Sequence, residues 1–132
     1  MPALPFVILR HVYDDEPEKD HFDFLFETEE GFDENARTLV AFRSLALDDD
    51  GFMFTAERLE NHRRLYLDYE GPISGGRGRV LRIRSGTAFL RDAGVTLAVW
   101  YRFDDDPDME TRYAVACHAN DDRWLFWHPD PS

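Results

Sequence analysis

The sequence predicts a mainly β protein: a compact closed or partly open β-barrel of about eight strands with one or two short helices. The chain has 132 residues, enough for a single domain, 1–132, with its own core. Short apolar runs recur along it, separated by turns rich in Asp, Pro and Gly. Helical periodicity is thin, so closely packed strands must bury most of the apolar side chains.

The clearest strand is 21–27, where apolar and polar residues alternate strictly and Phe22, Phe24 and Phe26 share one face. The best helical segment is 55–65, in which Thr55 is a potential N-cap and Leu59 the apolar anchor. The other strands that we expect, in chain order, are 5–11, 38–42, 79–84, 87–90, 96–103, 113–117 and 123–127.

The formal net charge of −12 argues against a protein that coats nucleic acid through bulk electrostatics. The charge is uneven, because residues 55–91 hold eight arginines and only four acidic residues. Such a basic middle suits a local anion site, since guanidinium groups match phosphate. A general preference of the genome for arginine is the alternative explanation, as the chain has 14 Arg and one Lys.

The single cysteine, Cys117, excludes a disulfide framework and a Cys-based zinc site. It favours a reducing compartment, and we expect a cytoplasmic protein. The apolar run 3–9 is too short to span a membrane and lacks the features of a signal peptide, so we expect no membrane partner.

Three polar groups could carry chemistry. His21 and Asp23 share a strand face, and His11 closes the preceding strand; two His and one carboxylate are a recurrent set for a divalent metal. His62 and Tyr66 would share a face if their segment is helical, and with nearby arginines could hold a phosphate. The alternatives are a structural His–Asp pair and an ordinary surface helix.

The third group is the Gly-rich segment 71–78, which contains neither G-x-G-x-x-G nor a P-loop. Its glycines favour a tight turn between strands, with Arg77 at the tip as a possible phosphate contact.

Several motifs follow one another along nearly the whole chain. The run 6–11 ends in His11 and is followed by the His-x-Asp strand at 21–23. Residues 60–62 read acid-x-His, with Tyr66 four residues later. The remaining pieces are 68–71, 76–80 with 85–87, and the Trp-bearing run 123–126. Their order and spacing resemble the phosphoesterase domain of bacterial DNA ligase D, an end-joining DNA repair enzyme.

The resemblance implies a compact β-barrel that processes 3′ ends of DNA or RNA with manganese, although Zn²⁺ or another divalent ion is an alternative. That family removes a terminal ribonucleoside and then the remaining 3′-phosphate. By resemblance His11, His21 and Asp23 would hold the metal. The expected phosphate-binding and catalytic residues are His62, Tyr66, Glu60 in a supporting role, Arg64 and Arg77. The expected partners are nucleic-acid 3′ ends and a separate ligase or polymerase, and we expect a monomer.

One position departs from the pattern. The family places an Arg two residues after the metal-binding Asp, and this chain has Leu25 there. Another arginine would have to contact the phosphate, and the candidates are Arg43, Arg63, Arg64 and Arg77. The departure leaves open a binding module of the same fold that recognises phosphate or nucleic-acid ends without turnover. A metal-dependent enzyme for a non-nucleotide substrate and a purely structural barrel are further alternatives.

Overall fold

The computed structural model describes residues 3–45, 53–120 and 123–129. In this part of the chain the elements are strands and two single 3₁₀ turns, and no helix has the length and hydropathy needed to cross a membrane. The elements, in order, are β1 (Leu4–Val12), η1 (Pro17–Lys19), β2 (His21–Glu27), β3 (Leu39–Ser44), β4 (Met53–His62), η2 (Arg64–Leu67), β5 (Gly71–Pro72), β6 (Arg79–Asp92), β7 (Thr96–Phe103), β8 (Arg112–Asn120) and β9 (Arg123–Trp127).

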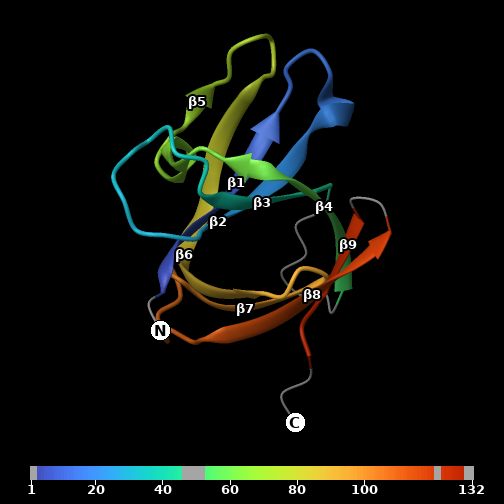
Figure 1. The fold of residues 1–132 in the computed structure, drawn as a ribbon. Helices are drawn as coiled ribbons and strands as arrows, with labels where there is room; N and C mark the ends of the chain where they lie inside the picture. The colour runs from blue at the N-terminus through green and yellow to red at the C-terminus, as the bar shows by residue number, and fades with distance from the viewer. Residues whose placement is uncertain (1–2, 46–52, 121–122, 130–132) are drawn as a thin grey trace.

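The strands form a closed antiparallel barrel, which confirms the predicted fold class. The order around the barrel is β1-β2-β3-β4-β9-β8-β7-β6, and β6 pairs back onto β1 to close it (Figure 1). The additional strand β5 pairs with the start of β6. β6 is 14 residues long, so its first half can pair with both β1 and β5 while its second half pairs with β7.

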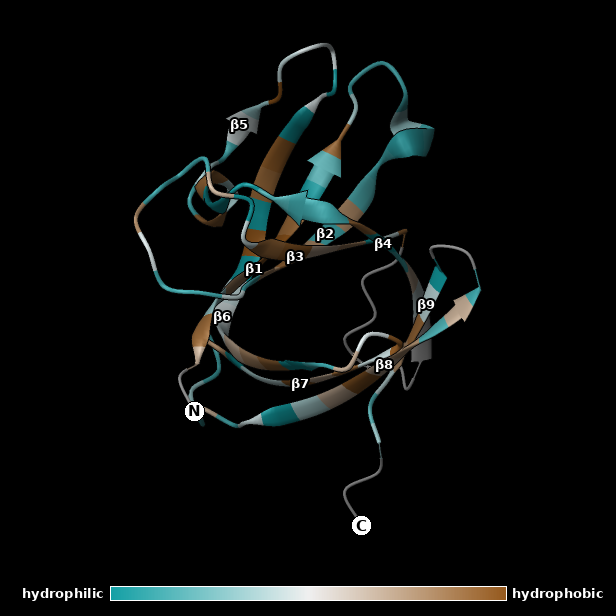
Figure 2. Cartoon of the chain, in the orientation of Figure 1, coloured by the Kyte–Doolittle hydropathy of each residue, from teal (hydrophilic) through white to brown (hydrophobic). Residues whose placement is uncertain are grey.

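Apolar side chains from all around the barrel fill its interior, and Figure 2 shows brown (hydrophobic) segments between teal (hydrophilic) ones along the strands. Phe26 is buried there and Phe24 packs against the cluster, as the alternation in 21–27 predicts. Phe22 lies differently: it is half-buried, with the Arg10 guanidinium 5.5 Å from its ring centre. Of the three phenylalanines on the predicted apolar face, Phe24 and Phe26 therefore pack in the core.

A second apolar cluster lies on the opposite, outer face of β1, β2, β3 and β6. It contains Leu9 and Leu25, which are almost fully buried, and Tyr66 from η2 packs against it. The cluster positions the candidate site, because the polar residues that follow Leu9 and precede Leu25 continue the same face of the sheet.

One predicted element is wrong, and two predicted strands are joined into one. Residues 55–65 are not helical: β4 occupies most of the segment and pairs with β3 and β9, with Ala56 buried between exposed neighbours in the alternation of a strand. Only the short turn η2 follows it. The expected strands 79–84 and 87–90 are one strand, β6. The strand continues through Gly86. At this position glycine permits a close approach to β7, where any side chain would strike the carbonyl of Arg102.

Candidate metal and phosphate site

His11, His21 and Asp23 come together on the outer face of the β1–β2 pair. His11 lies directly across from His21, and Leu9 lies across from Asp23, so the three polar side chains share one face. All three are buried, with 8%, 3% and 5% of their surface exposed. One candidate ligand atom from each lies within 4.8 Å of the others.

Backbone carbonyls fix the tautomer of both imidazole rings. His21 Nδ1 donates to the carbonyl of Lys19 at 2.9 Å, which leaves the lone pair of Nε2 facing Asp23 Oδ1 at 3.2 Å. His11 Nε2 donates to the carbonyl of Arg77, and its Nδ1 faces Asp23 Oδ2 at 3.6 Å. His21 Nε2 and Asp23 Oδ1 have no hydrogen-bond partner although both atoms are buried. The lone pairs of these two atoms therefore face each other, an arrangement that a bound cation would stabilise.

The electrostatics keep Asp23 ionised. Burial opposes its charge, but the contacts with His11 and His21 outweigh burial and lower the pKa of Asp23 to about 2. Burial also opposes a charged His11, yet Asp23 and the Arg77 carbonyl raise the pKa of that imidazole. At neutral pH the site is therefore an ionised carboxylate that attracts a positive charge, supplied either by a proton on a histidine or by a metal ion.

The three residues fit a divalent metal. Two imidazole nitrogens and a carboxylate are a donor set that Mn²⁺, Zn²⁺ and Fe²⁺ all accept. The carbonyls of Lys19 and Arg77 bind the outer nitrogen of each ring, an arrangement typical of metal-bound histidines because it fixes the ring and its tautomer. Tyr13 stacks on His11, with ring centres 4.5 Å apart, and holds that ring further.

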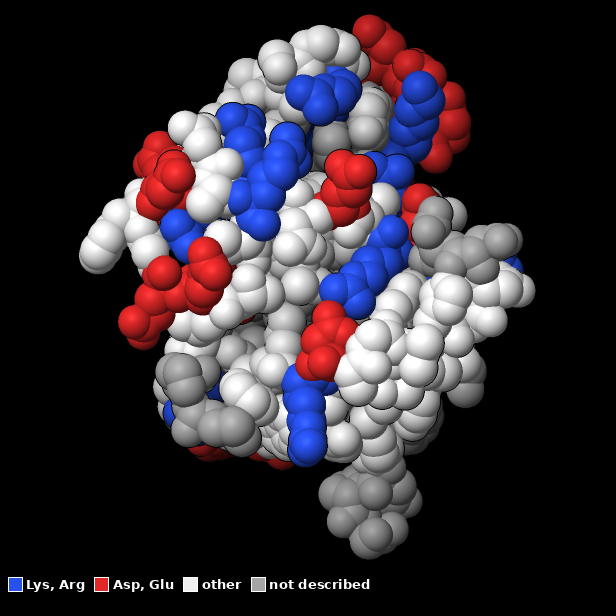
Figure 3. Space-filling view, in the orientation of Figure 1, with Lys and Arg blue, Asp and Glu red and all other residues white. Residues whose placement is uncertain are grey.

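A cavity of about 380 Å³ opens beside the metal group. Its walls contain the side chains of Leu9, Leu59, Ile73 and Val80, and its polar lining comes from five elements and the loops between them. The polar lining residues are His11, Tyr13, Asp23, Arg37, Arg43, His62, Arg63, Tyr66 and Arg77. Among these lining residues four guanidinium groups outnumber the one carboxylate. Blue side chains gather on the same upper part of the molecule, between β5 and β4 (Figure 3).

His62 and Tyr66 meet in this cavity, but through a strand end and a turn rather than along a helix. β4 ends at His62, and η2 then carries Tyr66 to within 6.0 Å of the imidazole, measured between ring centres. His62 Nδ1 donates to the carbonyl of Glu60 at 2.9 Å, so Nε2 is the nitrogen left for a ligand. Leu39, across from His62 on β3, belongs to the apolar cluster beneath.

The other predicted phosphate residues lie in different surroundings. Glu60 contributes its carbonyl to His62, while its side chain is exposed and is not among the described residues that line the cavity. Arg64 points away, with its Nε 2.7 Å from Glu27 Oε2. Arg77 lines the cavity; its guanidinium donates to the carbonyl and hydroxyl of Ser74, and its own carbonyl holds His11.

Sequence reasoning missed Tyr13 and Arg37 as lining residues. Tyr13 lies in the loop just after His11, and Arg37 in the loop before β3, so their approach to the cavity depends on loop conformations that no local pattern encodes. Arg43 was one of four arginines considered, and the β2–β3 register singles it out, because it lies directly across from Asp23.

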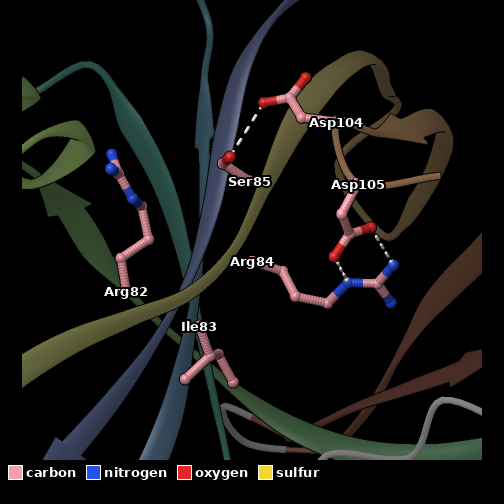
Figure 4. Close-up of a pocket in the computed structure, with 6 residues that line it drawn as sticks. All are labelled: Arg82, Ile83, Arg84, Ser85, Asp104 and Asp105. Atoms are coloured by element: carbon pink, nitrogen blue, oxygen red, sulfur yellow. Dashed lines mark hydrogen bonds and ion pairs between the residues drawn. The ribbon is translucent and has the colours of Figure 1, made fainter. Parts of the chain in front are cut away.

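A second, smaller pocket of about 210 Å³ lies at β6 and the loop after β7. Its charges pair with one another: Arg84 donates to both carboxylate oxygens of Asp105 at 2.6 and 3.2 Å, and Ser85 donates to Asp104 at 2.9 Å (Figure 4). Arg82 points away from the two aspartates in this view. Because its polar groups are mutually satisfied, this pocket is a poorer candidate than the cavity beside Asp23.

No protein-family model matches the chain, and no curated protein matches it significantly. What the fold and the site define is a class: a closed antiparallel β-barrel with a buried His-His-Asp group that could bind a metal, next to a cavity lined with arginines.

Proposed function

We propose that this protein is a metal-dependent phosphoesterase that acts on the 3′ ends of nucleic acid. The observation that carries the proposal is the group formed by His11, His21 and Asp23, in which His21 Nε2 and Asp23 Oδ1 are buried without a hydrogen-bond partner, next to a cavity rich in arginine. Manganese is the metal that the resemblance to the ligase D domain implies. A bound divalent ion would polarise a phosphoryl oxygen and make a coordinated water more acidic.

The chain's own residues supply the rest of the chemistry. Tyr66, whose ring contacts His62 in the cavity, offers a hydroxyl that can donate to a non-bridging phosphate oxygen. His62 keeps Nδ1–H on the Glu60 carbonyl, so an imidazolium places its second proton on Nε2, where it can neutralise phosphate charge or pass to the leaving ester oxygen. The guanidinium groups around them stabilise the same charge.

The size and charge of the cavity support recognition of an end rather than of a long tract. About 380 Å³ accommodates a terminal phosphate with its sugar and excludes a duplex. The formal net charge of −12 repels extended nucleic acid, whereas one terminal phosphate experiences mainly the local field of the metal and the arginines. We further propose that the protein acts as a cytoplasmic monomer in end repair, alongside a separate ligase or polymerase.

The decisive experiment measures trimming of a labelled primer–template that ends in a 3′-ribonucleotide or a 3′-phosphate, with and without Mn²⁺. We expect metal-dependent release of the nucleoside or phosphate, and loss of that activity in His21→Ala. His118→Ala is the matched control, because His118 is an exposed histidine on β8 and not among the described lining residues. Full activity in His21→Ala, or trimming that ignores chelation of the metal, would overturn the assignment.

A second candidate function is a binding module that recognises phosphate ends without turnover. It is favoured by Leu25, which is fully buried in the outer apolar cluster at the position where the resemblance calls for an arginine. Titration with an oligonucleotide that bears a 3′-phosphate separates the two functions. Tight metal-dependent binding without product release, under conditions in which the metal is shown to be bound, would favour the binding module.

A further inference from the structure

Arg43 differs from the other arginines of the cavity, because it has no partner in the described part of the chain. Each of the others donates to a protein oxygen: Arg37 to the Asn61 carbonyl, Arg63 to Asn35 Oδ1 and Arg77 to Ser74. Arg43 has no hydrogen bond or ion pair with any described residue, and its Nε is buried and unsatisfied. Its side chain nevertheless lines the cavity.

The sheet register places Arg43 beside the metal group. It lies directly across from Asp23 on β3 and across from Glu57 on β4, so its side chain leaves the sheet on the face that carries the two histidines. Its positive charge is felt at His11, where it lowers the pKa against the larger influence of Asp23. Among the described residues, however, no carboxylate forms an ion pair with it.

A half-buried guanidinium without a counter-charge is unfavourable unless a ligand completes it. Within the described part of the chain, Arg43 faces the cavity and shares that space with the metal group, so a ligand in the cavity can supply the counter-charge. A planar guanidinium binds two oxygens of one phosphate at once, a geometry that an ammonium group cannot reproduce.

We propose that Arg43 anchors a terminal phosphate dianion beside the metal ion that the His11–His21–Asp23 group would hold, and so makes the cavity selective for phosphomonoesters over phosphodiesters. The selectivity follows from charge: a monoester carries two negative charges at pH 8 and a diester one, so a fixed positive charge acts about twice as strongly on the monoester. This inference deepens the proposed function and rests on the same cavity.

The test uses two simple probes, methyl phosphate and dimethyl phosphate, titrated calorimetrically into the full-length protein in the presence of Mn²⁺ at pH 8. We expect Arg43→Gln to weaken methyl phosphate binding by at least about tenfold and dimethyl phosphate binding by less than about threefold. Arg43→Lys, which keeps the charge but loses the fork, should fall between the two. Arg91→Gln is the matched control, an exposed arginine of β6 that should leave both affinities unchanged.

Two further measurements separate binding from a structural role. Because Arg43 Nε has no hydrogen-bond partner and the residue lies directly across from Asp23, Arg43→Gln removes a positive charge beside the metal group without breaking a hydrogen bond at that atom. The variant should therefore keep the melting temperature and bind Mn²⁺ at least as tightly as the unmodified chain. Equal methyl phosphate affinity in both proteins would overturn the inference, as would failure of methyl phosphate to bind the unmodified chain. A parallel loss of both probes together with lower thermal stability would assign Arg43 to structure instead.

The outcomes for the two proposals are distinguishable. If binding of methyl phosphate depends on Arg43 but the protein trims no 3′ end, the result supports Arg43 as the phosphate anchor and contradicts the proposed phosphoesterase function. If Mn²⁺-dependent trimming occurs and Arg43→Gln changes neither methyl phosphate affinity nor the ratio of monoester to diester turnover, the phosphoesterase stands and the anchor fails.

Discussion

Replacing Arg64 with methionine should destabilise the fold without removing a phosphate contact. The guanidinium Nε lies 2.7 Å from Glu27 Oε2, and the two side chains are 11% and 3% exposed. Arg64 also donates to the carbonyl of Asp33 at 3.1 Å and lies against Gly31, so it ties η2 to the loop between β2 and β3. The positive charge of Arg64 is therefore neutralised by Glu27 inside the fold.

The size of the effect follows from this burial. Removing one partner of a buried ion pair costs about 3–5 kcal/mol, because the other charge is left without compensation. Glu27 keeps hydrogen bonds from the backbone N–H groups of Thr28 and Glu29, so we expect the lower end, about 3 kcal/mol. In a domain of this size that corresponds to a fall in melting temperature of about 10 °C.

The pH dependence has a definite sign. Burial opposes the charge of Glu27, but the nearby Thr38 hydroxyl and hydrogen bonds from Arg64 and the neighbouring backbone outweigh it and lower the pKa of Glu27. The unfolded chain therefore takes up this proton first as the pH falls. The stabilisation is complete above the ordinary Glu range and is lost as the pH falls through the lower pKa of the folded state, and Arg64→Met should reduce that loss.

The assay is urea unfolding followed by tryptophan fluorescence for the unmodified chain, Arg64→Met, Glu27→Gln and the double variant. The double variant should lose less than the sum of the single losses, because it leaves no unpaired charge. Phosphate affinity of folded Arg64→Met should be unchanged. If Arg64→Met instead kept its stability and lost phosphate binding, the structural reasoning would be wrong and Arg64 would return to the site.

Three other predictions concern the site and the turn before β6. Mn²⁺ at about 100 times its dissociation constant should stabilise the protein by about 2.7 kcal/mol, seen as a higher melting temperature, and His21→Ala should abolish this shift. Tyr66→Phe keeps the ring in the apolar cluster but removes the hydroxyl, so phosphate affinity should fall while the melting temperature holds. Gly78→Ala should cost at least about 1–2 kcal/mol in urea unfolding, since Gly78 has a φ of +75° and a methyl there would strike the Val12 carbonyl.

The fold class was predictable because β-barrel strands carry local signals. The run 21–27 matches β2 at both ends, and 96–103 and 123–127 match β7 and β9. β4 escaped prediction since its inner face holds Ala56 and Arg58 in place of large apolar residues, so alternation was hidden. β5, at two residues, is too short for a pattern and exists through its pairing with β6.

The candidate metal group was predictable in part. The period of a strand puts His21 and Asp23 on one face from sequence alone, and the β1–β2 hairpin register then supplies His11. The partners that fix both rings were not predictable, because they are backbone carbonyls. One of them, from Arg77, is 66 residues away from His11 in the chain and reaches it through the turn before β6.

An anchoring role for Arg43 on the neighbouring strand would make Leu25 compatible with an anion site. Residue 25 pairs with Ala41, one step deeper on the sheet face than the Asp23–Arg43 pair, and its side chain belongs to the apolar cluster against which Tyr66 packs. An arginine at 25 would have to extend out from under η2 to reach a phosphate, whereas the side chain at 43 begins beside Asp23.

If Arg43 is the anchor, Leu25→Arg should lower stability without raising methyl phosphate affinity in the otherwise unmodified chain. In the Arg43→Gln background the same substitution should also fail to restore that affinity. Rescue there would show that the two strand positions are interchangeable, and that the deeper position of residue 25 does not matter.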